Sequence, residues 1–186
     1  MRHLTVLVLL IASLLCVRQA SAQDAGSIGV TMGYPASVGL LWHVTERVAL
    51  RPELTFNHSS TETDTTLPIG GINTSASNNY VVVGLSALFY VAKWDSTRAY
   101  VVPRYGFSRS TTSTEGVVVT QLNFESTVTT HSGGVSFGAQ HLLGEHFAIY
   151  GELGLSYDRL STELPTAEGH GHAFGTRSGV GVTVYF

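Results

Sequence analysis

The C-terminal segment, residues 178–186, alternates apolar side chains with polar, small or amphipathic ones. Val180, Val182, Val184 and Phe186 occupy the apolar positions, and glycine, threonine and tyrosine stand between them. A two-residue period is typical of a β-strand that has one apolar face. A strand that closes a barrel in a lipid bilayer has this form, because its outward side chains meet hydrocarbon and its terminal aromatic residue lies at the interface.

The same period recurs along the chain and predicts eight strands. Tight turns alternate with long segments rich in serine, threonine, glycine and asparagine, which we interpret as loops; only the first connection, near Pro35, is short on that side. An even number of strands with short turns at one end and long loops at the other is the expected layout of an outer-membrane barrel whose termini both lie in the periplasm. The predicted strands cover residues 26–34, 36–44, 48–58, 79–93, 98–110, 128–143, 147–160 and 173–186, and the predicted loops cover residues 59–78, 111–127 and 161–172.

The two faces of the predicted strands differ in chemistry. One face is apolar, and the other carries a few charges of both signs between glycines. A water-soluble barrel would need many charges on its outer face, whereas a charge at the centre of a bilayer costs about 2–4 kcal/mol. The sparse charges therefore fit a crowded lumen and the apolar face fits lipid; a soluble β-sandwich or periplasmic barrel is the competing interpretation. The apolar face includes Ile28, Met32, Val38, Leu40, Leu50, Leu54, Val83, Leu85, Val101, Val135, Ile149, Leu153 and Leu155.

Aromatic residues on the apolar face separate by height along the strands. One group lies toward the short turns and the other toward the predicted loops, as expected of two belts around a membrane-spanning aliphatic band. The first group is Trp42, Phe147 and Phe186, and the second is Tyr34, Phe56, Phe107, Tyr157 and Phe174.

Two prolines conflict with a closed sheet. Pro52 and Pro103 lie within predicted strands, and each removes a backbone donor. We expect both at bulges near the periplasmic rim.

The first 22 residues have the features of a secretory signal peptide. A basic start, Met1–His3, precedes an apolar stretch that is too short for a stable transmembrane helix, and Ala20–Ala22 forms a small-residue cleavage site. We therefore assign residues 1–22 to the signal peptide and residues 23–186 to one outer-membrane β-barrel domain.

Composition agrees with a membrane barrel. Charged residues make up 12% of the chain, against about 25% in ordinary soluble domains. Without Arg2 and Arg18 of the signal peptide, 8 basic residues face 13 acidic ones, a net charge of −5 that argues against a nucleic-acid partner. Cys16, the only cysteine, lies in the signal peptide, so the mature domain has no thiol for a disulfide or a metal.

The mature sequence resembles the small eight-stranded outer-membrane β-barrel family of Gram-negative bacteria, the OmpA/OmpX-like or porin-family proteins. The resemblance covers the whole mature chain and rests on the signal peptide, the hairpin rhythm, the strand Val48–Phe56 with its Arg-Pro pair, and the C-terminal Val-Thr-Val-Tyr-Phe. It implies an all-β, antiparallel, up-and-down transmembrane barrel, exported to the outer membrane after cleavage behind Ala22. It also implies that Val182, Val184 and Phe186 are the signal read by the barrel-assembly machinery. We expect a monomer surrounded by outer-membrane lipid and lipopolysaccharide.

Five charged residues share the predicted lumen. An eight-stranded barrel is only wide enough to be filled by side chains, so we favour a structural network of ion pairs and hydrogen bonds. A narrow gated pore, in which these pairs exchange partners to admit water and ions, is the alternative. The five residues are Arg51, Glu53, Arg104, Glu152 and Arg177.

Two pairs of residues suggest chemistry. His58 and Ser60 form the local pattern that a lipid A hydrolase would need, but no acidic residue is placed by motif to orient the imidazole. His170 and His172 offer two imidazoles, but two histidines in a loop make a weak metal site. We predict no catalytic residue, no metal site and no cofactor.

The predicted long loops are the remaining functional surface, because loops carry function more often than the scaffold that holds them. Residues Val117–Phe124 could extend strands beyond the membrane into an edge that binds a partner strand. We favour the alternative that such strands merely overshoot the bilayer. We expect a non-enzymatic protein with a filled lumen that acts in envelope integrity or in surface binding through its extracellular loops. A narrow porin is the first alternative and a lipid A-modifying hydrolase the second, and the extracellular ligand stays unnamed.

Overall fold

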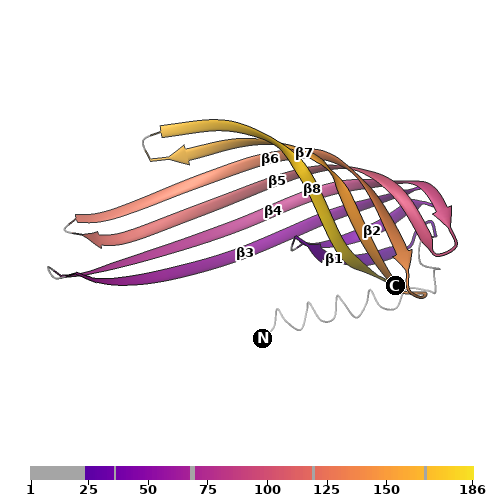
Figure 1. The fold of residues 1–186 in the computed structure, drawn as a ribbon, viewed down its shortest axis with the longest axis horizontal. Helices are drawn as coiled ribbons and strands as arrows, with labels where there is room; N and C mark the ends of the chain where they lie inside the picture. The colour runs from indigo at the N-terminus through magenta and orange to yellow at the C-terminus, as the bar shows by residue number, and fades with distance from the viewer. Residues whose placement is uncertain (1–23, 36, 68–69, 119, 166) are drawn as a thin grey trace.

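The computed structural model describes residues 24–186 apart from residues 36, 68–69, 119 and 166 (Figure 1). The signal peptide predicted at residues 1–22 lies outside the described part of the chain. Within the described residues, no helix is long and apolar enough to cross a membrane.

Eight antiparallel strands follow one another around a closed barrel. Each strand is hydrogen-bonded to its neighbours in the sequence, and the last strand returns to pair with the first. The predicted eight-stranded, up-and-down antiparallel barrel is therefore confirmed. The strands are β1 (Ile28–Tyr34), β2 (Ser37–Thr45), β3 (Val48–Leu67), β4 (Gly70–Trp94), β5 (Thr97–Val118), β6 (Thr120–Leu142), β7 (Phe147–Leu164) and β8 (Ala167–Tyr185).

The strands are staggered by ten residues around the barrel. Thr31 of β1 pairs directly with Thr183 of β8. In the other direction, from β2 round to β8, the residues paired in register with Thr31 end at Ala173, which lies ten residues before Thr183. A stagger of this size in an eight-stranded barrel corresponds to strands tilted by roughly 40° from the axis. The residues on this path are Gly39, Glu53, Gly84, Gly106, Ser132 and Asp158.

The ring closes only in the half of the barrel that carries the short turns. β2 pairs with β3 as far as Leu54, and β1 pairs with β8 as far as Val180. Beyond these residues β3 to β8 continue as a curved sheet, which we call the projecting sheet. Figure 1 shows β3 to β6 extending together well past β1 and β2, with the β7–β8 hairpin beside them. Within the described residues, β3 from Phe56 onward and β8 before Val180 each have one edge without a strand partner.

The long loops predicted at residues 59–78, 111–127 and 161–172 are wrong, because the strands continue through nearly all of these segments. The strand extension considered for Val117–Phe124 agrees with β5, which ends at Val118, and β6, which begins at Thr120. β3 and β4 keep one register from Val48 opposite Phe89 to Leu67 opposite Gly70. Threonine-rich segments resemble loops in composition, yet the β-branched threonine side chain suits a strand. A hairpin partner in continuous register also satisfies the backbone donors and acceptors.

Pro52 and Pro103 do not lie at bulges, contrary to the prediction. The register runs unchanged past both residues, and the two irregularities, between β2 and β3 and between β4 and β5, fall nearer the short turns. A proline lacks one N–H and so removes a ladder bond on one side only. The other side stays paired, Pro52 with Leu85 and Pro103 with Val135.

Side-chain and backbone features explain two of the short turns. Between β2 and β3, the hydroxyl oxygen of Thr45 accepts hydrogen bonds from the backbone nitrogens of Arg47, at 3.2 Å, and Val48, at 3.0 Å. Between β4 and β5, Asp95 has a φ of 35°, in the left-handed region that aspartate tolerates better than most residues. Each turn therefore has a local cause in the sequence.

Candidate functional site: the barrel lumen and its outer surface

Four charged side chains meet inside the closed ring and form what we call the ion cluster. Arg51 and Glu53 come from β3, Arg104 from β5 and Glu152 from β7. Arg51 Nη2 lies 2.7 Å from Glu152 Oε1, and Arg51 Nε lies 3.7 Å from Glu53 Oε1. Arg104 Nη2 lies 3.0 Å from Glu152 Oε2 and 3.3 Å from Glu53 Oε2. Each arginine therefore contacts both carboxylates, and the formal charges of the cluster cancel.

A serine from β4 links two members of the ion cluster. Ser86 Oγ donates a hydrogen bond to Glu53 Oε2 at 3.3 Å and accepts one from Arg104 Nε at 2.7 Å. Ser86 is completely buried. Its hydroxyl therefore satisfies charged groups that have little access to water.

Two tyrosines complete the surroundings of the ion cluster. The Tyr100 hydroxyl donates a hydrogen bond to Glu152 Oε1 at 3.0 Å. The guanidinium carbon of Arg51 lies 5.1 Å from the centroid of the Tyr150 ring, within the range of a cation–π contact. Because Arg51 is only 1% exposed, the loss of a carboxylate partner would leave a buried charge uncompensated.

Arg177 is placed apart from the ion cluster. It stands on β8 opposite Gly154 of β7. Among the described residues, no carboxylate lies within 4.0 Å of its side chain. Arg177 instead lines a cavity of about 390 Å³, together with Glu53, Arg104, five serines and four glycines. The cavity therefore borders the ion cluster, and both polar and apolar side chains line it.

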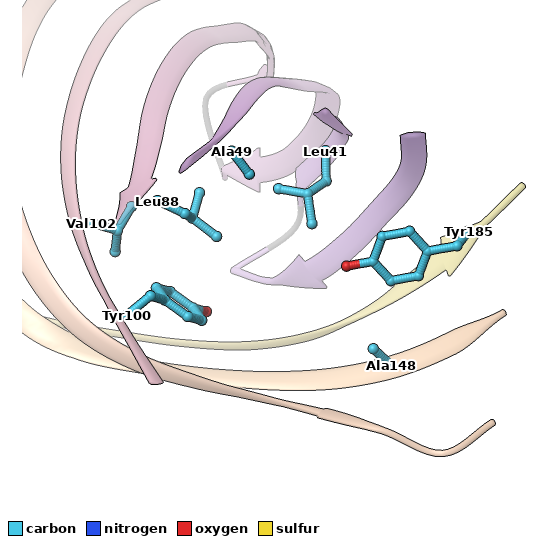
Figure 2. Packing of buried hydrophobic residues seen from close by; sticks show 7 residues of the cluster. All are labelled: Leu41, Ala49, Leu88, Tyr100, Val102, Ala148 and Tyr185. Atoms are coloured by element: carbon cyan, nitrogen blue, oxygen red, sulfur yellow. The ribbon is translucent and has the colours of Figure 1, made fainter. Parts of the chain in front are cut away.

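An apolar plug fills the lumen on the short-turn side of the ion cluster. Figure 2 shows its side chains converging from β2, β3, β4, β5, β7 and β8. None of them is more than 2% exposed. An eight-stranded barrel is just wide enough for side chains to fill it, and here large apolar groups occupy that width. The apolar plug consists of Leu41, Ala49, Leu88, Tyr100, Val102, Ala148 and Tyr185.

A chain of hydrogen bonds runs through the short-turn end of the lumen. The Tyr185 hydroxyl accepts from Gln140 Nε2 at 2.7 Å and lies 3.2 Å from His43 Nε2. The Tyr90 hydroxyl donates to Gln140 Oε1 at 3.1 Å, and its ring stacks on His43 with centroids 5.5 Å apart. We did not predict this group of four residues from the sequence, although the two-residue alternation along the strands could have placed them on the inner face.

The outer face of the closed ring is apolar. Leu153 is 67% exposed and Met32 is 53% exposed, and every strand has at least one large apolar side chain exposed on its outer face. Exposed aromatic side chains include Trp42, Trp94 and Phe147 toward the short turns and Tyr34, Phe56, Phe107, Tyr157 and Phe174 toward the projecting sheet. A continuous apolar surface of this kind is unfavourable in water but matches a bilayer with an aromatic belt at each interface. The chain folds as a small transmembrane β-barrel.

The barrel is similar to solved structures at low sequence identity. The sequence matches no protein-family model and no curated protein sequence. CarO of Acinetobacter baumannii is 12% identical, with a TM-score of 0.43 and coverage of 90% of this chain and 100% of that one. CarO2 of the same organism is 12% identical, with a TM-score of 0.42 and coverage of 86% and 97%. Ail, the attachment invasion locus protein of Yersinia pestis, is 10% identical, with a TM-score of 0.36 and coverage of 86% and 94%.

The barrel places His58 and Ser60 on one face of β3 within the projecting sheet. His58 Nδ1 is hydrogen-bonded to Asn79 Oδ1 at 2.7 Å. In the part of the chain that the structure describes, no hydrogen bond or ion pair joins His58 to Ser60 or to a carboxylate. The orienting acid that a hydrolase would require is therefore not next to His58.

His170 and His172 lie on β8 rather than in a loop. His170 Nδ1 lies 3.2 Å from Ser161 Oγ, and the His172 ring stacks on Tyr157 with centroids 6.4 Å apart. Over residues 24–186, excluding the few that are not described, no three histidine, cysteine, aspartate or glutamate side chains gather as metal ligands would. Each of the two imidazoles instead contacts β7.

Val182, Val184 and Phe186 lie at the end of the strand that seals the barrel. β8 is paired with β1 on one side and with β7 on the other. The backbone nitrogen of Phe186 donates to the carbonyl oxygen of Ile28 at 3.1 Å. The C-terminal residues therefore form part of the seam at which the first and last strands meet.

Proposed function

We propose that this chain is a non-enzymatic bacterial outer-membrane β-barrel protein with a side-chain-filled lumen. The observation that carries the proposal is the stacking of the ion cluster on the apolar plug inside one narrow ring. A barrel filled in this way does not offer partners a channel. It offers them its lipid-facing wall and its projecting sheet. Its site of action is then the membrane around it or the surface above it.

The projecting sheet supports a role in envelope integrity or surface binding. Outside the closed ring, β3 and β8 each leave a strand edge unpaired within the described residues. Unpaired strand edges can accept a partner strand through backbone hydrogen bonds. An extracellular ligand that binds through an extended segment fits this surface.

A narrow porin is the second candidate, favoured by the cavity of about 390 Å³ that Arg177 lines next to the ion cluster. Conduction would require the pairs of Arg51 and Arg104 with Glu53 and Glu152 to exchange partners and the apolar plug to move. Ion flux through the refolded barrel distinguishes this candidate from the first. A lipid A hydrolase has no comparable support, because His58 bonds to an amide and not to a carboxylate.

The proposed partners follow from the position of the barrel in the outer membrane. Lipid and lipopolysaccharide would surround the apolar wall, and the barrel-assembly machinery would read Val182, Val184 and Phe186 during insertion. The closed ring pairs every strand with neighbours of its own chain, which supports a monomer.

Trimming the projecting sheet tests which surface acts. We would replace residues 60–77 and 112–126 with two-residue Asn-Gly turns, which suit hairpins, and express this variant and the full chain in host cells lacking the gene. If the wall maintains the envelope, both restore resistance to detergent and large antibiotics; if the sheet binds, only the full chain restores surface attachment. Slower uptake of small hydrophilic solutes in cells lacking the gene, restored by either form, would contradict the proposal and favour a porin.

A further inference from the structure

Four strands repeat the same pair of exposed residues at the upper end of the apolar band. In each, an aromatic residue is followed, two positions further toward the projecting sheet and on the same face, by a basic residue. Two strand positions correspond to about 6.6 Å, so the basic side chains lie just above the aromatic belt. The pairs are Phe56 with His58 on β3, Phe107 with Arg109 on β5, Tyr157 with Arg159 on β7, and Phe174 with His172 on β8.

A histidine on β6 makes this series continuous from β5 to β8. His131 is paired in register with Phe107 on one side and Arg159 on the other, and Arg159 is paired in turn with His172. The Tyr105 hydroxyl lies 2.7 Å from His131 Nδ1, which fixes the ring and leaves Nε2 without a hydrogen-bond partner in the described residues. We call the set His58, Arg109, His131, Arg159 and His172 the basic belt.

The basic belt lacks counter-ions within the described chain. Neither Arg109 nor Arg159 has a carboxylate within 4.0 Å among the described residues. Asp158, next to Arg159 in sequence, has the opposite parity and points to the other face of β7. Exposed acids on the outer face of these strands stand four or six positions further out, beyond the level of the basic belt. These acids are Glu62, Glu115, Glu125, Glu163 and Glu168.

We propose that the basic belt binds the phosphate groups of lipid headgroups in the leaflet nearest the projecting sheet. This inference rests on the proposed function, because it requires the aromatic belt to lie at a membrane interface. Headgroup phosphates lie just outside that interface, at the level that the basic belt occupies. Guanidinium groups bind phosphate through paired, charge-assisted hydrogen bonds. Arg159, with an imidazole on each side, forms the centre of the site.

Binding of single lipids to the detergent-solubilised barrel tests this proposal. The protein is refolded in maltoside micelles, folding is checked by the mobility of unboiled samples on gels, and apparent dissociation constants are obtained by native mass spectrometry. The probes are phosphatidic acid, the phosphate-free digalactosyldiacylglycerol, and inorganic phosphate. We expect the wild type to bind phosphatidic acid at least about tenfold more tightly than either of the other two.

Two double variants with the same change in charge separate the belt from general electrostatics. Arg109→Gln/Arg159→Gln removes two charges from the basic belt, and Arg47→Gln/Lys93→Gln removes two exposed charges at the short-turn end. The first variant should bind phosphatidic acid about tenfold more weakly or worse, and the second should match the wild type. If the first variant does not fold, His131→Gln/His172→Gln replaces it, with an expected loss of about threefold.

Three results would overturn the proposal. They are equal affinity of the wild type for phosphatidic acid and the galactolipid, equal losses in the two charge variants, and binding of inorganic phosphate as tight as that of phosphatidic acid. A wild-type barrel that failed to insert into membranes at all would count against the proposed function instead, so the two failures are distinguishable.

Discussion

Arg51 and Glu152 join opposite sides of the barrel. β3 and β7 are separated by three strands in either direction around the ring, yet Arg51 Nη2 and Glu152 Oε1 lie 2.7 Å apart. The contact spans the lumen, and Arg104 makes a second contact with the same carboxylate. The ion cluster therefore ties distant strands together as well as filling the space between them.

Substitution of Glu152 should destabilise the barrel strongly. Glu152→Gln leaves Arg51 and Arg104 with one carboxylate between them, and breaking a buried ion pair in this way costs about 3–5 kcal/mol. The free energy of unfolding in urea, measured in lipid vesicles by tryptophan fluorescence, provides the value. Glu163→Gln, an exposed site on the projecting sheet, is the matched control and should change stability by less than about 0.5 kcal/mol. Similar losses at both sites would contradict the structural role of the cluster.

A methyl group at Gly138 should also be destabilising. A Cβ at this position would lie 2.6 Å from atoms of the Tyr100 ring, and that ring is fully buried and hydrogen-bonded to Glu152. Overpacking of this kind costs about 1–3 kcal/mol. Gly151→Ala, where no atom lies within 4 Å of the added carbon, should be tolerated. Equal urea midpoints for the two alanine variants would show that the ring moves aside freely.

Loss of the Tyr185 hydroxyl should weaken the short-turn end of the lumen. Tyr185→Phe removes the group that contacts both His43 and Gln140, leaving buried polar atoms unsatisfied at a cost of about 1–3 kcal/mol. Hydrogen exchange of the β8 amides should rise with the drop in stability. Tyr80→Phe serves as the control because its hydroxyl makes no hydrogen bond within the described residues. Unchanged exchange in Tyr185→Phe would argue that water replaces the hydroxyl.

Phe186 should matter more for assembly than for stability. In cells, Phe186→Ala should reduce the folded, heat-modifiable fraction severalfold, whereas the purified variant should refold into vesicles like the wild type. Phe174→Ala removes an aromatic ring from β8 at the other interface and should assemble normally. If Phe186→Ala assembled as well as the wild type, the role of the C-terminal residues as an assembly signal would be contradicted.

Alternation along the strands predicts much of this fold because one register decides both faces of a strand. It correctly gave the barrel, the number of strands and the apolar outer wall. Composition wrongly predicted loops for the serine- and threonine-rich segments, because backbone pairing along the hairpins keeps these segments in strands. No local pattern predicts which side chains pair across the lumen. Alternation places Arg51, Arg104 and Arg177 on the inner face alike. Only the three-dimensional arrangement brings Arg51 and Arg104 to carboxylates and leaves Arg177 beside a cavity.

Single-channel conductance tests the central claim of a filled lumen most directly. The mature protein would be refolded into a planar bilayer after its folding is confirmed by gel mobility, with a Leu88→Ala/Tyr100→Ala variant of the apolar plug as the comparison. We predict that the wild-type barrel is electrically silent and that only the plug variant shows openings. Discrete, reproducible steps from the folded wild type, altered by Arg51→Gln, would contradict the filled lumen and make the ion cluster a gate.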